Sequence, residues 1–146
     1  MELIQFDTIQ VAGLSVRTTN DAEMTPDTAK ISALWAKFYG DLSPMLDPHS
    51  RVFGLYTHYE SDHTGAFDVV ACADSLTGKN LEEHQIPAGN YVKFQHTGEM
   101  PQAVIDLWGE VWAYFASEKC AHTRAFTTDF ECYKSEQEVE IYIAVK

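Results

Sequence analysis

Apolar residues recur at spacings of three and four in two stretches of the chain, and this periodicity predicts two amphipathic helices. Thr25-Pro26-Asp27 supplies a helix-start signal for the first, which we expect to end before Pro44. Met100-Pro101 opens the second. Their apolar positions are Ala29, Ile31, Leu34, Trp35, Phe38 and Leu42, and then Val104, Leu107, Trp108, Val111, Trp112 and Phe115.

Shorter apolar stretches between turn-forming residues predict strands. Residues 9–17 form the first, and its Ala12-Gly13 interruption indicates a bulge or a close backbone approach. Residues 51–59 and 67–73 form a hairpin around the polar turn 60–65, and the polar residues 74–80 connect onward. Further strands are predicted near 86–92, 129–133 and 139–141.

The two halves of the chain repeat one pattern. Ala12-Gly13 and Leu34-Trp35 in the first half correspond to Ala88-Gly89 and Leu107-Trp108 in the second. Each half reads strand–helix–strand–strand, with halves of about 1–76 and 77–146 within one domain, 1–146. Because such a half buries its own faces poorly, the halves should join about a pseudo-two-fold axis. We therefore expect an α+β fold, a curved antiparallel sheet with two main helices on one face and a central groove, where ligand pockets commonly form.

Glu131 is the acidic residue best placed to reach that groove. Period-two alternation puts Glu131 and Tyr133 on one face of their strand and Phe130 and Cys132 on the other. An outward Glu131 is an ordinary solvated acid. An inward Glu131 is a buried negative charge, which costs several kcal/mol without a partner, so it needs hydrogen-bond donors, a raised pKa or a cation.

The composition narrows the possible partners. A net charge of −12 without a basic stripe disfavours nucleic-acid binding and favours cationic small molecules. No apolar run is long enough to span a membrane, and no signal peptide is visible, so we expect a cytoplasmic protein. The cysteines Cys72, Cys120 and Cys132 lack C-x-x-C spacing and are expected to be reduced.

Each of two further groups of polar residues could be either part of a functional site or ordinary solvent-facing surface. His58, Glu60, Asp62 and His63 could bind a metal, but they are typical of a solvated turn, and we expect neither metal nor cofactor. Asp68 and Glu140 are equivalent in the repeat. Each is either a second acid in the groove or, as we favour, a solvent-facing strand residue. No phosphate-binding loop, nucleophile elbow or catalytic dyad is visible.

The ordered set of motifs resembles the GyrI-like effector-binding domain family. The set comprises the duplication, Ile86-Pro-Ala-Gly-Asn-Tyr91, the tryptophan-bearing second helix, Phe130-Glu-Cys-Tyr133 and the closing Val139-Glu-Ile-Tyr-Ile143. This bacterial family includes ligand-sensing domains of AraC-type and MerR-type multidrug regulators. It also has stand-alone members, among them a DNA gyrase inhibitor and cassette-encoded proteins that bind cationic drugs. No helix-turn-helix flanks the domain here, so we expect no direct DNA binding, although a regulator could be a protein partner.

The resemblance implies a site. The family glutamate of Phe-Glu-x-Tyr faces the groove and pairs with cationic ligands, and Glu131 is the matching residue. Trp108 and Trp112 correspond to pocket-wall residues in similar proteins. Aromatic walls bind flat cations through cation–π contacts. The predicted ligand-binding residues are Glu131, Tyr133, Trp108, Trp112, Tyr91, Tyr56, Phe94 and Tyr142, with Trp35, Phe38 and Tyr39 as weaker candidates.

The sequence therefore predicts a non-catalytic protein that binds hydrophobic, cationic small molecules with broad selectivity. Two alternatives stay open. A small-molecule hydrolase could use the same glutamate to activate water. A protein-interaction module of the gyrase-inhibitor type would instead present an exposed apolar patch.

Overall fold

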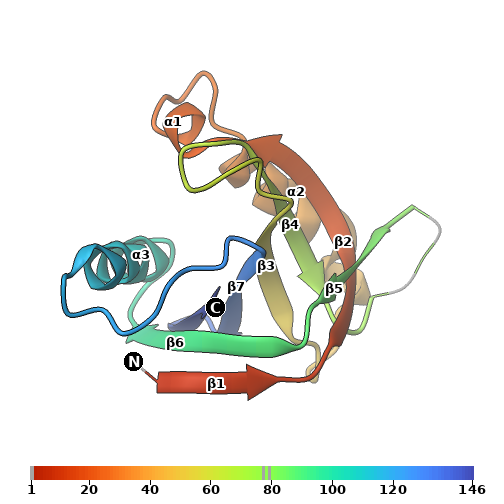
Figure 1. The fold of residues 1–146 in the computed structure, drawn as a ribbon. Helices are drawn as coiled ribbons and strands as arrows, with labels where there is room; N and C mark the ends of the chain where they lie inside the picture. Colours follow the sequence, from red (N-terminus) through yellow and green to blue (C-terminus); the bar gives the residue numbers. More distant parts are fainter. Residues whose placement is uncertain (1, 77, 79) are drawn as a thin grey trace.

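The computed structural model describes residues 2–76, 78 and 80–146 (Figure 1). Its elements are β1 (Glu2–Phe6), β2 (Ile9–Thr18), α1 (Asn20–Glu23), α2 (Ile31–Leu42), the 3₁₀ turn η1 (Ser43–Met45), β3 (Val52–Thr57), β4 (Phe67–Ala73), β5 (Glu82–Ile86), β6 (Gly89–Thr97), α3 (Gln102–Ala116), β7 (Thr128–Ser135) and β8 (Glu138–Ala144). No helix in the described ranges is long and apolar enough to cross a membrane.

All eight strands form one antiparallel sheet in the order β1-β6-β8-β7-β3-β4-β2-β5. Strands β1 to β4 of the first half correspond in chain order to β5 to β8 of the second. When each strand is exchanged for its counterpart, the strand order is the same read from the opposite end. The central pair is β3 and β7, with Gly54 opposite Glu131 and Tyr56 opposite Asp129. The expected α+β fold with pseudo-two-fold symmetry is confirmed, while the division at about residue 76 stays a prediction.

The sheet curls into a half-barrel, as the path of β1, β6 and β2 shows in Figure 1. Phe6 lies on the edge strand β1, yet its ring is 5.6 Å from that of Phe130 on the central strand β7. Three strand spacings of about 4.8 Å separate those strands in a flat sheet, so only curling brings the rings together. One apolar cluster fills the concave face, and Tyr91 and Tyr142 belong to it.

The two long helices cover the other, convex face. Leu34, Phe38 and Leu42 bury one side of α2 against β2 and β4. Ala103, Leu107 and Val111 do the same for α3 against β6 and β8. Neither helix covers the central strands β3 and β7 completely, and the groove lies there.

Two local expectations were wrong or incomplete, and a third lies partly outside the described residues. The chain around Thr25 forms turns, not a helix start, and α2 begins at Ile31 because the Glu23 carboxylate accepts from the amides of Lys30 and Ile31. The edge strands β1 and β5 were missed because both are short and mostly polar or exposed. The connector predicted at 74–80 contains residues 77 and 79, which lie outside the described residues.

The close approach expected at Gly13 is confirmed. A Cβ at this position in β2 would lie 1.9 Å from the Ala71 carbonyl oxygen on β4. Only glycine fits where two backbones come this close.

Candidate functional site

A groove of about 1500 Å³ lies between α2 and α3 over the central strands. One wall comes from α2 and includes Trp35 and Tyr39. The opposite wall comes from the start of α3 and includes Val104 and Trp108. A cavity this large accommodates a drug-sized molecule.

Glu131 lies at the base of this groove and is only 3% exposed. Its Oε2 accepts hydrogen bonds from the Tyr56 hydroxyl at 2.8 Å and the Trp108 Nε1 at 2.7 Å. Its Oε1 accepts from the Tyr133 hydroxyl at 2.7 Å. Hydrogen-bond donors from β3, α3 and β7 therefore converge on one carboxyl group.

The charge state of this group follows from its surroundings. Burial raises the pKa of Glu131, and the bonds from Trp108, Tyr133 and Tyr56 reverse only part of that rise. Burial and the adjacent carboxylate also raise the pKa values of Tyr56 and Tyr133, so both phenols stay protonated and donate.

Glu131 differs from the other buried acids of the described chain in having no cationic partner. Asp129 pairs with Arg124 at 2.7 Å, and Glu140 pairs with Lys93 at 3.1 Å. Within the described residues, no lysine, arginine or histidine nitrogen lies at ion-pair distance from Glu131. The donors that the described residues supply to its carboxyl group are all neutral.

Gly54 makes room for this carboxyl group. A Cβ at position 54 would lie 2.7 Å from Glu131 Oε1 and 3.0 Å from Trp35 Cζ2. Trp35 also packs edge-on against Tyr133, with ring centroids 5.4 Å apart, and stacks on Tyr39. The glycine therefore lets the acid and an aromatic wall share the same space.

Residues 2–145 match the Cass2 family of integron-associated effector-binding proteins. The chain belongs to this family. The resemblance to cassette-encoded effector-binding proteins is thereby confirmed.

Individual relatives agree with the assignment. An integron cassette protein from the mobile metagenome of Vibrio cholerae is 54% identical, with a TM-score of 0.95 over 99% of this chain and 95% of that one. YobU of Bacillus subtilis strain 168, named as a candidate transcriptional regulator, is 30% identical over 99% of this chain and 96% of its own length. The structure of SAV2435 bound to tetraphenylphosphonium shares the fold, with 19% identity and a TM-score of 0.76 over 99% and 93% of the two chains.

The structure brings together some of the predicted site residues. Glu131, Tyr133, Trp108 and Tyr56 all line the groove. Trp35 and Tyr39, expected to be weaker candidates, line it too, whereas Phe38 is fully buried in the core under α2. Trp112 is 40% exposed and lines a smaller neighbouring cavity.

Three predicted wall residues are elsewhere. Tyr91 and Tyr142 pack in the concave cluster, on the face of the sheet away from the groove, because each alternates with residues that face α3. Phe94 faces α3 but is buried against Tyr114 and Phe115. The predicted list of wall residues includes these aromatic residues without assigning each to the groove face or to the concave face of the sheet.

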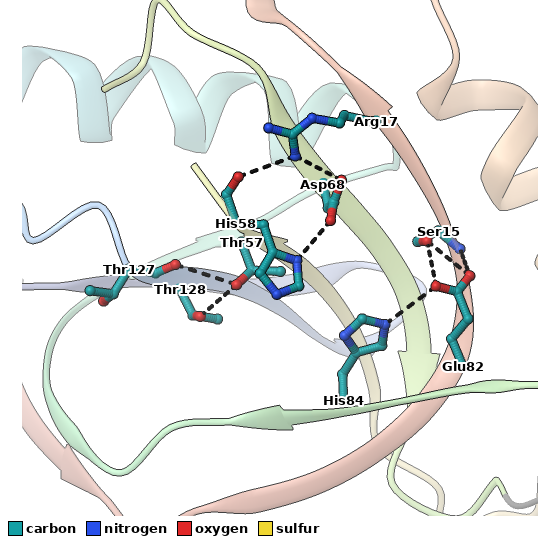
Figure 2. A network of polar contacts seen from close by, with 9 residues as sticks. All are labelled: Ser15, Arg17, Thr57, His58, Asp68, Glu82, His84, Thr127 and Thr128. Atoms are coloured by element: carbon teal, nitrogen blue, oxygen red, sulfur yellow. Dashed lines mark hydrogen bonds and ion pairs between the residues drawn. The ribbon is translucent and has the colours of Figure 1, made fainter. Parts of the chain in front are cut away.

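The other polar candidates do not enter the groove. Asp68 and Glu140 alternate with residues packed under the helices, so both lie on the opposite face. Figure 2 shows Asp68 between His58 and Arg17, at 2.7 and 3.0 Å. Although partial burial raises the pKa of Asp68, these partners outweigh it and the net shift is downward. Glu140 is buried, so the favoured interpretation of it as a solvent-facing strand residue is wrong.

Gly54 is not among the residues singled out from the sequence, although the strand pattern around this glycine contains a signal for it. An isolated glycine between Phe53 and Leu55 in a strand pattern indicates a close approach. Among the described residues, no three or more His, Cys, Asp or Glu side chains lie together in a group that could hold a metal ion.

Proposed function

We propose that the protein binds hydrophobic, cationic small molecules in the groove between α2 and α3, with Glu131 as their counter-ion. The observation that carries the proposal is the buried Glu131 carboxylate, which has three neutral donors and, among the described residues, no cationic partner. A buried charge of this kind gains most from an incoming opposite charge, because the groove walls exclude the water that would screen it.

The walls suit a flat or multi-ring cation. Trp35, Tyr39 and Trp108 present aromatic surface to the groove. Each cation–π contact contributes about 0.5–2 kcal/mol, depending on desolvation. Charge and stacking define shape only loosely, so we propose recognition of a class of lipophilic cations. The tetraphenylphosphonium bound by SAV2435 belongs to that chemical class.

A fluorescence titration with ions of matched shape tests the proposal. Tetraphenylphosphonium should quench tryptophan emission saturably, whereas tetraphenylborate, with the same four phenyl groups and the opposite charge, should not. Glu131→Gln should weaken phosphonium binding at least tenfold, about 1.4 kcal/mol. Glu136→Gln is the control, since Glu136 is an exposed acid on the same groove and its loss changes the net charge equally.

The outcomes separate the alternatives. Equal weakening in both variants would assign the effect to the overall acidic field and remove Glu131 from the site. Absence of saturable binding in the wild type would overturn the cation-receptor proposal and favour the interaction module. In a separate assay, turnover of a hydrolysable small molecule by the wild type that Glu131→Gln abolishes would favour the hydrolase.

A further inference from the structure

A second cavity of about 200 Å³ adjoins the groove. Ile31, Tyr56 and Trp108 line both spaces, so these three side chains form the constriction between them. The rings of Tyr56 and Trp108 meet edge-on with centroids 5.1 Å apart. We name this second space the side cavity. It also contacts Trp112 and Arg124.

Arg124 is a largely buried charged residue of the side cavity with unused hydrogen-bond donors. Its side chain is 10% exposed, and its Nη2 donates to Asp129. Nε has no hydrogen-bond partner, and Nη2 is the only guanidinium nitrogen of Arg124 that forms a hydrogen bond within the described residues. A guanidinium carries five N–H donors, so most of its capacity is unused.

Three other polar side chains of the side cavity already have partners, while His63 and Trp112 are exposed to water. Glu23 accepts from Thr18, Lys30 and Ile31. The Tyr59 hydroxyl donates to Asp129. The Asn20 amide donates to the His63 carbonyl. Within the described chain, Arg124 is therefore the group here that would gain most from an acceptor.

We infer that the side cavity receives a carbonyl-bearing arm of the ligand, with Arg124 donating to the carbonyl oxygen. This inference rests on the proposed function and narrows the ligand class to lipophilic cations that carry an ester or amide. A neutral acceptor fits better than an anion, because Asp129 already balances the charge of Arg124 and Glu23 lies nearby.

The spacing is compatible with one molecule occupying both spaces. Asp129, which holds Arg124, lies two residues from Glu131 on β7. Two residues of a strand span about 7 Å. An arm of about seven atoms can therefore extend from a cation at Glu131 to the guanidinium.

Two triphenylphosphonium ions of equal arm length test this inference. One carries a four-methylene arm that ends in a methyl ester, and the other carries an n-heptyl arm. In Arg124→Lys, we expect the ratio of the Kd of the heptyl ion to the Kd of the ester ion to fall about fivefold or more. Lysine keeps a positive charge beside Asp129 but lacks the planar guanidinium that donates to the ester carbonyl. Glu131→Gln should weaken both ions and leave the ratio unchanged.

Nuclear Overhauser contacts locate the arm independently of any variant. The ester methyl should contact the Trp112 indole in the side cavity. Contacts with Tyr39 or Ile105 alone, which line only the groove, would overturn the inference, as would a ratio unaffected by Arg124→Lys. If neither ion binds the wild type, the proposed function itself fails. Binding of both with an unchanged ratio removes only the side-cavity inference.

Discussion

Asp129 and Glu131 lie two residues apart on β7, both buried on the side that carries the helices, yet of the two only Asp129 has a cationic partner within the described chain. Asp129 accepts from Arg124, from Tyr59 and from the Ala144 amide. Glu131 accepts from two phenols and an indole. Burial raises the pKa of both acids, but replacing Asp129 by its amide leaves the buried Arg124 guanidinium without its counter-charge. Replacing Glu131 or Asp129 by its amide should therefore change the stability of the protein in opposite directions.

Glu131→Gln should stabilise the unliganded protein at neutral pH. The pKa of Glu131 is raised above its unfolded value of 4.5 by burial. Its protonated form therefore stabilises the fold at low pH, and this contribution is lost as pH rises through the folded pKa. Each unit of upward shift corresponds to about 1.4 kcal/mol.

Urea unfolding of both proteins at pH 4, 6 and 8 measures this effect. The advantage of the glutamine variant should grow with pH and then level off above the folded pKa. Glu136→Gln, at an exposed position, should show no such growth. A difference from wild type that is constant over the whole range would contradict the raised pKa.

Asp129→Asn should destabilise the protein by about 3–5 kcal/mol, because it leaves the Arg124 guanidinium buried without a counter-charge. Denaturant unfolding measures the change. Asp68→Asn is the control, since its pair with Arg17 is partly exposed, and it should cost about 1 kcal/mol or less. Comparable losses in the two variants would show that burial of the Asp129 pair is unimportant.

Gly54→Ala should weaken phosphonium binding and lower stability by about 1–3 kcal/mol, because the new methyl would meet Glu131 Oε1 and Trp35. Calorimetric titration and thermal unfolding measure the two effects. Gly109→Ala, on α3 with open space around its Cβ, is the matched control. It should stabilise by about 0.5–1 kcal/mol and leave binding unchanged. Normal binding by Gly54→Ala would mean that Glu131 need not occupy its observed position.

Trp108→Phe should shift the pH dependence of cation binding. Loss of the indole donor destabilises the ionised form of Glu131, so the pKa rises further and the carboxyl stays protonated to a higher pH. As the pH is lowered, phosphonium affinity should therefore begin to fall at a pH about one unit higher than in wild type. Affinity measured from pH 4 to 9 shows the shift. Trp112→Phe should not produce it, because Trp112 makes no hydrogen bond to Glu131 in the described structure.

Much of the fold could be predicted from local patterns. The apolar periodicity identified both long helices, and the duplication led to the two-fold arrangement of the sheet. The start of α2 was misplaced because its cap, Glu23, comes from the preceding helix and not from the Thr25-Pro26 signal. Short polar edge strands such as β1 and β5 carry little pattern of their own and depend on pairing with a neighbour.

The sequence by itself determined that an acid and a tyrosine share a strand face, because strand alternation is a local property of the backbone. Only the tertiary structure decided which aromatic residues stand beside them. Tyr56 and Trp108 reach Glu131 from residues 75 and 23 positions away, while Tyr91 and Tyr142 turn to the concave side. The pairing of Asp129 with Arg124, rather than of Glu131 with it, likewise depends on where the loop bearing Arg124 packs. Those long-range contacts follow from how the sheet curls and the helices dock, and no local period encodes them.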